Sequence, residues 1–182
     1  MTVLTVAVVL VTGLCLLNLL LTVAVIRRLK EHTALIGGGV DGSDAFPDSM
    51  LPGGARIGTY SAETLDGTVL TRDDLHGHTL IGVFSPGCSG CAQQLPHFVE
   101  LAGNTPGGRD GVLALVVGGL EEAAGEIAQL APVARVVHEA DDGPLTRALG
   151  VQAFPAIARV DADGRVLASG VEVADLENAA DV

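Results

Sequence analysis

Basic residues are scarce in this 182-residue chain, which has 10 lysines and arginines against 22 aspartates and glutamates and a formal net charge of −12. Arg27, Arg28 and Lys30 stand close together, so from Glu31 onward the other 7 basic residues face all 22 acids. Nucleic acids and anionic membrane surfaces are bound through basic surfaces. The composition therefore argues against both as partners of the chain beyond residue 30.

Cysteine is also scarce, with three in the chain, two of which form the pair Cys88-x-x-Cys91. Small secreted domains stapled by several disulfides need more than one pair and a spare, so that class is excluded. A zinc site needs further ligands, and the chain has neither a second Cys-x-x-Cys nor a His-x-x-x-His pattern. We therefore predict no metal and no cofactor, and we interpret His76, His78 and His97 as surface side chains.

Charge is absent from Val3–Ile26, a long and mostly apolar run. About 20 apolar residues cross the hydrocarbon core of a bilayer, so this run is long enough to span it. A cleaved signal peptide would have a basic region before the run and a small-residue cleavage site after it, and both are missing. A lipoprotein signal fails because Leu14 precedes Cys15, where such signals have a small residue. We predict one retained transmembrane helix over 3–26, with Cys15 as an ordinary apolar side chain.

Glycine, serine, proline and aspartate dominate the segment that follows the basic cluster. Residues 27–50 contain Gly37-Gly38-Gly39 and have the composition of a juxtamembrane segment and flexible linker. From 51 to 182 strand and helix patterns alternate, which indicates an α/β domain with a mixed sheet flanked by helices. Asp66-Gly67 predicts a hairpin at its start. The later strands are expected at 79–84, 112–117, 134–137, 156–160 and 166–169, and the helices at 91–102, 120–130, 141–149 and 173–181.

The stretch Cys88-Ser89-Gly90-Cys91 lies between the expected strand 79–84 and the expected helix 91–102. A dithiol in this position is a candidate redox site. The free N–H groups and the dipole of a helix N-terminus favour the thiolate of Cys88, and the small residues between the cysteines leave its sulfur accessible. Cys91, one turn further on, is then the shielded partner that resolves a mixed disulfide. A structural disulfide and a buried reduced pair are the alternatives.

This order of elements, with the dithiol at a helix start and Phe154-Pro155 just before the final hairpin, resembles the thioredoxin fold. The resemblance covers about residues 51–182. It implies that the Phe154-Pro155 bond is cis, lies opposite the dithiol and helps to bind an extended substrate segment. Pro96, five residues after Cys91, matches the proline that kinks the active-site helix of that family.

Three features make the family resemblance more specific. They are the predicted anchor, the hairpin at Asp66-Gly67 and the insertion between the helix after the dithiol and Pro155. They are similar to the TlpA-like branch of membrane-anchored thiol-disulfide oxidoreductases. The basic, histidine-containing segment from Arg27 to Leu35 is more loosely similar to that of the methylamine-utilisation accessory protein MauD. The family resemblance implies protein dithiols and disulfides as substrates.

Three glycine or glutamine positions depart from the family pattern. Gly87 stands where thioredoxins usually have a tryptophan, and the chain contains no tryptophan. Gly82 replaces the buried acid that many thioredoxins place six residues before the first cysteine, and Gln94 stands where some TlpA-like reductases have a glutamate. The family's usual carboxylates are therefore not available to take a proton from Cys91, which leaves the rate and direction of exchange open.

The residues and the resemblance together predict a thiol-disulfide oxidoreductase, in the reductase direction, that acts on protein disulfides through Cys88 and Cys91 and binds them at Phe154 and Pro155. Such a reductase needs an electron-transfer partner in the membrane. A non-catalytic assembly or metal-delivery factor for one client is the first alternative. A peroxiredoxin-like peroxidase is a weaker one, because Ile81 stands where the proline of that motif belongs.

Two arguments about the side of the membrane conflict. The basic residues after the predicted span favour a cytoplasmic C-terminal domain by the positive-inside rule. Disulfides persist outside the cytoplasm, and the family resemblance points the same way. We expect a single-pass protein of the cell membrane with its thioredoxin-like domain on the extracytoplasmic side.

Overall fold

The computed structural model describes Thr5, Gly13 and residues 48–178. The transmembrane helix predicted over 3–26 therefore lies outside the described residues apart from these two positions, as does the linker except for its last three residues. Within the described part of the chain, no helix is both long and apolar enough to cross a membrane.

A five-stranded mixed sheet forms the middle of the domain, in the order β5-β4-β3-β6-β7. β3 (Thr79–Phe84) and β4 (Val112–Val117) are buried along their whole length, as expected for strands covered on both faces. β3, β4 and β5 (Arg135–Glu139) are parallel, whereas β6 (Ala156–Val160) and β7 (Val166–Gly170) are antiparallel to their neighbours. The predicted mixed sheet is confirmed, and the chain leaves the C-terminal end of β3 toward the two cysteines.

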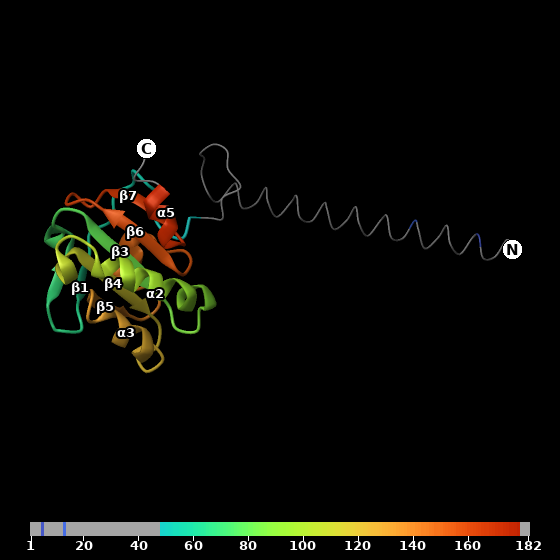
Figure 1. The fold of residues 1–182 in the computed structure, drawn as a ribbon, viewed down its shortest axis with the longest axis horizontal. Coiled ribbons are helices and arrows are strands. Elements are labelled where there is room, and N and C mark those ends of the chain that lie inside the picture. The colour runs from blue at the N-terminus through green and yellow to red at the C-terminus, as the bar shows by residue number, and fades with distance from the viewer. Residues whose placement is uncertain (1–4, 6–12, 14–47, 179–182) are drawn as a thin grey trace. The chain divides into compact units, whose positions relative to one another are not determined.

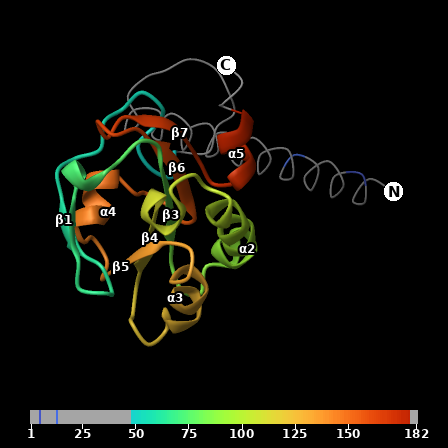
Figure 2. The ribbon, with the colours of Figure 1, turned by 60° about the vertical axis from the view of Figure 1, so that its left-hand side comes forward.

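Helices cover both faces of this sheet, as Figures 1 and 2 show. α2 (Ser89–Gly103), α3 (Ala124–Leu130) and α5 (Val173–Asn178) contribute to the apolar cluster on one face. α4 (Pro144–Leu149) belongs to the apolar cluster on the other face. The helix that carries the cysteines therefore lies between α3 and α5, with contacts to both.

A separate hairpin protects the edge of the sheet. β1 (Ser61–Glu63) pairs with β2 (Val69–Thr71), which confirms the turn predicted at Asp66-Gly67. Thr64, just after β1, forms a bridge with Val137 of the edge strand β5. On the opposite edge Arg56 forms a bridge with Arg165, next to β7. Both edges of the sheet thus have local partners, which limits edge-to-edge pairing between molecules. Two short 3-10 helices, η1 (Arg72–Asp74) and η2 (Gly108–Gly111), precede β3 and β4.

Two helices begin later than the sequence pattern predicts. α4 starts at Pro144 rather than at residue 141, because Asp142 has a left-handed φ of 61° that no helix accommodates. α3 starts at Ala124 rather than at residue 120, after a turn that follows Gly118, whose φ is 142°. Leu120, the first residue of the helix predicted over 120–130, lies in this turn and is 57% exposed. At the C-terminus, the predicted extension of the last helix to 181 falls on residues outside the described range.

A buried carboxylate caps the N-terminus of α4. Glu139, at the end of β5, is only 8% exposed. Its carboxylate oxygens accept hydrogen bonds from the N–H groups of Leu145 and Thr146 at 2.8 and 2.9 Å, and from the Thr146 hydroxyl at 2.8 Å. These are donors of the first helical turn, which have no partner inside the helix.

We expect Glu139→Ala to lower the free energy of unfolding by about 2–4 kcal/mol, because three buried donors lose a charged acceptor. Urea unfolding measures the loss. Glu121→Ala, at an exposed acid before α3, is the matched control and should change the stability little. Equal stabilities for the two variants would contradict the capping role.

Candidate redox site

Cys88 is the N-cap of α2, which begins two residues earlier than predicted. The residue has extended backbone angles, and its sulfur accepts a hydrogen bond from the Cys91 N–H at 3.1 Å. The first N–H groups of a helix have no intrahelical partner, so the sulfur takes the place that a serine or aspartate oxygen has in other caps. This contact and the helix dipole create a positive electrostatic potential at the half-buried Cys88 sulfur.

Cys91 is the shielded member of the pair. It is 2% exposed, and its sulfur accepts a hydrogen bond from the Ser85 N–H at 3.5 Å. Burial raises the pKa of the Cys91 thiol to about 12, and the contact with Cys88 acts in the same direction. Both cysteines are free thiols. The arrangement thus separates an accessible sulfur at the helix start from a buried sulfur that keeps its proton.

The predicted substrate-binding residues lie against the dithiol. The Phe154-Pro155 peptide bond is cis, as the family resemblance implies. The Cys88 thiol donates to the Phe154 carbonyl oxygen at a distance of 3.6 Å. A Cβ atom on Gly90 would lie 3.1 Å from the Pro155 Cδ atom, so the turn between the cysteines packs directly on the proline ring. All four residues singled out in the sequence meet at one place in the fold.

Ser49, which was predicted to belong to the linker, is hydrogen-bonded to the loop that contains Pro155. The Ser49 carbonyl oxygen accepts hydrogen bonds from the N–H groups of Gln152 and Ala153 at 2.8 and 3.2 Å. The Ser49 hydroxyl donates to the Gly170 carbonyl oxygen at 3.1 Å, and Met50 beside it is 1% exposed. The packed domain therefore includes Ser49 and Met50, so the segment predicted as linker over 27–50 extends too far at its C-terminal end. In the sequence, the apolar pair Met50-Leu51 was the feature that could have indicated this earlier start of the domain.

Aromatic rings fill the space beside Gly82, where many thioredoxins have a buried acid. A Cβ atom on Gly82 would lie 2.5 Å from the Phe98 ring and 2.8 Å from the Phe84 ring. The two rings pack edge to face with their centroids 5.2 Å apart. Phe98, on α2, thus occupies the space that a side chain at position 82 would need.

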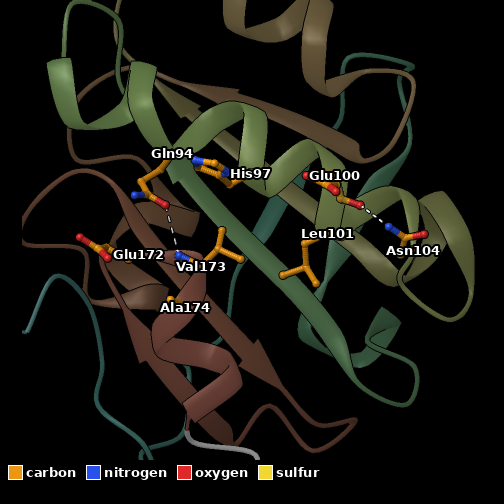
Figure 3. A pocket seen from close by; sticks show the side chains of 8 residues that line it. All are labelled: Gln94, His97, Glu100, Leu101, Asn104, Glu172, Val173 and Ala174. Carbon is orange, nitrogen blue, oxygen red and sulfur yellow. Dashed lines mark hydrogen bonds between the residues drawn. The ribbon is translucent and has the colours of Figure 1, made fainter.

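Gln94 is engaged elsewhere and does not serve as a substitute for that carboxylate. Its side-chain oxygen accepts a hydrogen bond from the Val173 N–H at 3.3 Å, at the start of α5. Figure 3 shows this contact at a cavity of about 470 Å³ that α2 and α5 line together. His97, beside Gln94 in that cavity, is exposed, as predicted.

His76 and His78 are exposed as well, and they precede β3, whereas Cys88 follows it. The two histidines are therefore at the opposite end of the strand from the dithiol. Within residues 48–178 no group of three or more histidine, cysteine or acidic side chains is arranged to hold a metal ion.

The loop between β4 and α3 is part of the site, although the sequence did not indicate it. A Cβ atom on Gly118 would lie 3.0 Å from the Pro86 Cδ atom, so this loop packs on the segment that leads to Cys88. The Gly118 N–H donates to the Glu139 carbonyl oxygen at 3.0 Å, and the Gly118 carbonyl oxygen lies 2.8 Å from the His138 Nε2 atom. The two adjacent glycines after a buried strand were the only signal for it.

Comparison with known proteins agrees with this arrangement. No protein-family model and no curated protein matches the sequence. The thioredoxin domain of a thiol-disulfide oxidoreductase from Bacteroides vulgatus has a similar structure, with a TM-score of 0.58 and 20% identity over 72% of this chain and 96% of that chain. The chain has the thioredoxin fold.

Two further solved structures are similar to this domain. A thiol:disulfide interchange protein from a Bacteroides species has a TM-score of 0.57 and 18% identity, covering 72% of this chain and 89% of its own. A secreted disulfide oxidoreductase of Mycobacterium tuberculosis, described as homologous to DsbE of E. coli, is also similar. Its TM-score is 0.53 and its identity 16%, over 68% of this chain and 96% of that chain. The predicted fold class of residues 51–182 is thereby confirmed.

Proposed function

We propose that this chain is a membrane-anchored, TlpA-like thiol-disulfide oxidoreductase that reduces protein disulfides, with its thioredoxin domain on the extracytoplasmic side. The observation that carries the proposal is the position of the Cys88 sulfur, 3.1 Å from the Cys91 N–H group and 3.6 Å from the Phe154 carbonyl oxygen. A substrate sulfur that reaches Cys88 therefore lies between a helix N-terminus and the proline loop. The redox activities named for the similar solved structures support the same reaction class.

The reaction follows from the difference between the two sulfurs. The Cys88 thiolate attacks one sulfur of a substrate disulfide, which forms a Cys88–substrate disulfide and releases the other substrate sulfur as a thiolate. The Cys91 thiol then loses its proton to water and attacks the Cys88 sulfur. The second substrate sulfur leaves as a thiolate, and two electrons have passed from the dithiol to the substrate. An electron-donating dithiol partner in the membrane restores the reduced pair.

The reductase direction follows from the resemblance to TlpA-like reductases and is tested by the reduction potential of the pair. A strong oxidant such as DsbA has a reduced form that is stabilised by the thiolate of its accessible cysteine. We expect the reduction potential of the pair to lie near that of thioredoxin, about −270 mV, rather than near that of DsbA, about −120 mV. Equilibration with glutathione buffers measures it. A value near DsbA's would reverse the proposed direction.

Trapping of a mixed disulfide tests the exchange reaction itself. We expect Cys91→Ser to accumulate a covalent complex with protein substrates through Cys88, because the second step has lost its nucleophile. Cys88→Ser is the matched control and should form none. The complexes are counted on non-reducing gels of membranes that contain each variant.

Two other results would favour the alternatives. Absence of a trapped complex together with binding of a metal ion that needs both cysteines would indicate a metal-delivery factor. Consumption of hydrogen peroxide that needs Cys88 alone would indicate a peroxidase. The membrane location rests on the apolar run 3–26 and is tested by protease treatment of intact cells, which should digest an extracytoplasmic domain.

A further inference from the structure

The β4–α3 loop carries an exposed leucine. Leu120 is 57% exposed, although it follows a strand whose six residues are all buried. Its loop packs on Pro86, two residues before Cys88, through the close approach at Gly118. The loop and the segment that leads to Cys88 are thus neighbours, and we expect an extended client segment, which advances about 3.3 Å per residue, to reach both.

The loop is held in one position by the strands beneath it. Gly118 is fixed on both sides of its backbone, by the Glu139 carbonyl oxygen at 3.0 Å and by His138 Nε2 at 2.8 Å. The Gly119 carbonyl oxygen accepts a hydrogen bond from the Ala123 N–H at 2.9 Å, which closes the turn that contains Leu120. The leucine is therefore presented by an ordered turn, so its exposure does not result from a loose end of the chain.

A carboxylate accompanies the leucine. The Glu122 side chain folds back over the loop, where its Oε2 atom lies 3.3 Å from the position of a Cβ atom on Gly119. None of the ion pairs among the described residues includes Glu122. The segments at this end of the sheet (85–88, 118–123, 140–143 and 152–155) contain no lysine or arginine. The carboxylate of Glu122 in the β4–α3 loop therefore has no lysine or arginine partner in these segments.

We propose that the β4–α3 loop is a specificity wall of the redox site, which selects a client segment with an apolar residue and a lysine or arginine close to its reactive cysteine. Leu120 covers the apolar residue, and Glu122 pairs with the cation. This inference rests on the proposed disulfide exchange and names the class of substrate for it. An acidic client segment would meet like charge, which penalises binding at an interface.

Peptide substrates test the selection without altering the protein. Three short peptides are prepared, each with one cysteine joined to glutathione through a disulfide. The first has a leucine and a lysine beside the cysteine, the second replaces the lysine by glutamate, and the third replaces the leucine by serine. Their reduction by the full-length dithiol form in detergent is compared with reduction of glutathione disulfide. We expect the lysine peptide to react about tenfold faster than the glutamate peptide at low salt, and the ratio to fall as salt is added.

Protein variants then assign the effect to the loop. Glu122→Gln should bring the lysine-to-glutamate ratio close to one, and Leu120→Ser should remove the difference between the leucine and serine peptides. The matched controls are Glu63→Gln, at an exposed acid of β1, and Leu167→Ser, at a leucine of β7 that is 41% exposed. Both controls should keep the ratios of the unaltered chain.

The outcomes separate the two proposals. Equal rates for all three peptides, with normal reduction of glutathione disulfide, would overturn the specificity wall and leave the exchange function intact. Equal loss of selectivity in the variants and the controls would also overturn it. Failure to reduce glutathione disulfide as well as the peptides would overturn the exchange function, and the inference with it.

Discussion

Release of a thiol from a mixed disulfide on Cys88 is expected to accelerate about tenfold per pH unit between pH 6 and 9, about a thousandfold in total. Only the thiolate of Cys91 attacks, and burial raises its pKa to about 12. Throughout this range the thiolate is a small fraction that grows in proportion to hydroxide. The measurement uses the chain with Cys88 joined to a coloured aromatic thiol, whose release is followed by absorbance.

The Cys91→Ser variant is the control for this profile, because any remaining release in it comes from solvent. Levelling of the rate below pH 9 would contradict the prediction, since it would mean that Cys91 ionises near the ordinary cysteine pKa of 9.0. Higher pH is avoided for a reason that also follows from this pKa. Between about 9 and 12 the unfolded chain loses the Cys91 proton while the folded chain keeps it, so the stability of the fold decreases as the pH rises.

Gly82→Asp, which restores the acid of many thioredoxins, is expected to lower the free energy of unfolding by more than about 4 kcal/mol. The new Cβ atom would lie 2.5 Å from the Phe98 ring and 2.8 Å from the Phe84 ring, both of which are fully buried. The carboxyl group would also enter an apolar cluster. Urea unfolding followed by circular dichroism measures the loss.

Two glycine variants separate the causes of that loss. Gly82→Ala adds only the Cβ atom and should cost about 1–3 kcal/mol, the usual range for overpacking. Gly103→Asp, in the last residue of α2 with open space around it, makes the same substitution without the clash and should change the stability by less than about 1 kcal/mol. A Gly82→Asp protein as stable as the Gly103→Asp protein would show that the space beside the dithiol accepts a carboxylate.

Phe98 and Gly82 together explain one departure from the family pattern. The absence of an acid at position 82 was visible in the sequence, but its meaning was not, because nothing local links position 82 to position 98. The close approach of the Phe98 ring shows that glycine is required there by packing. Position 82 therefore supplies no carboxylate that could accept the Cys91 proton. The raised pKa of Cys91 results from its burial.

The boundaries of the helices show where local pattern was insufficient. The apolar spacing from Leu120 to Leu130 is compatible with a helix throughout, yet the helix begins only at Ala124. The strand β4 ends against Pro86 and His138, and the chain needs a turn at that point before it can return along the sheet. Tertiary contacts thus override the helical period, and Leu120 lies in an exposed loop instead of the predicted helix.

The sequence by itself determined the strands, the hairpin, the dithiol at a helix start and the proline before the last hairpin, because each depends on residue types and spacings within a short stretch. Only the tertiary structure decided which of these stretches meet. Cys88 and the Phe154 carbonyl oxygen are 66 residues apart in the chain and 3.6 Å apart in the fold. The brace at Ser49, the ring beside Gly82 and the loop at Leu120 likewise depend on the strand order β5-β4-β3-β6-β7. That order results from burial of both faces of the sheet at once, which no single stretch of sequence encodes.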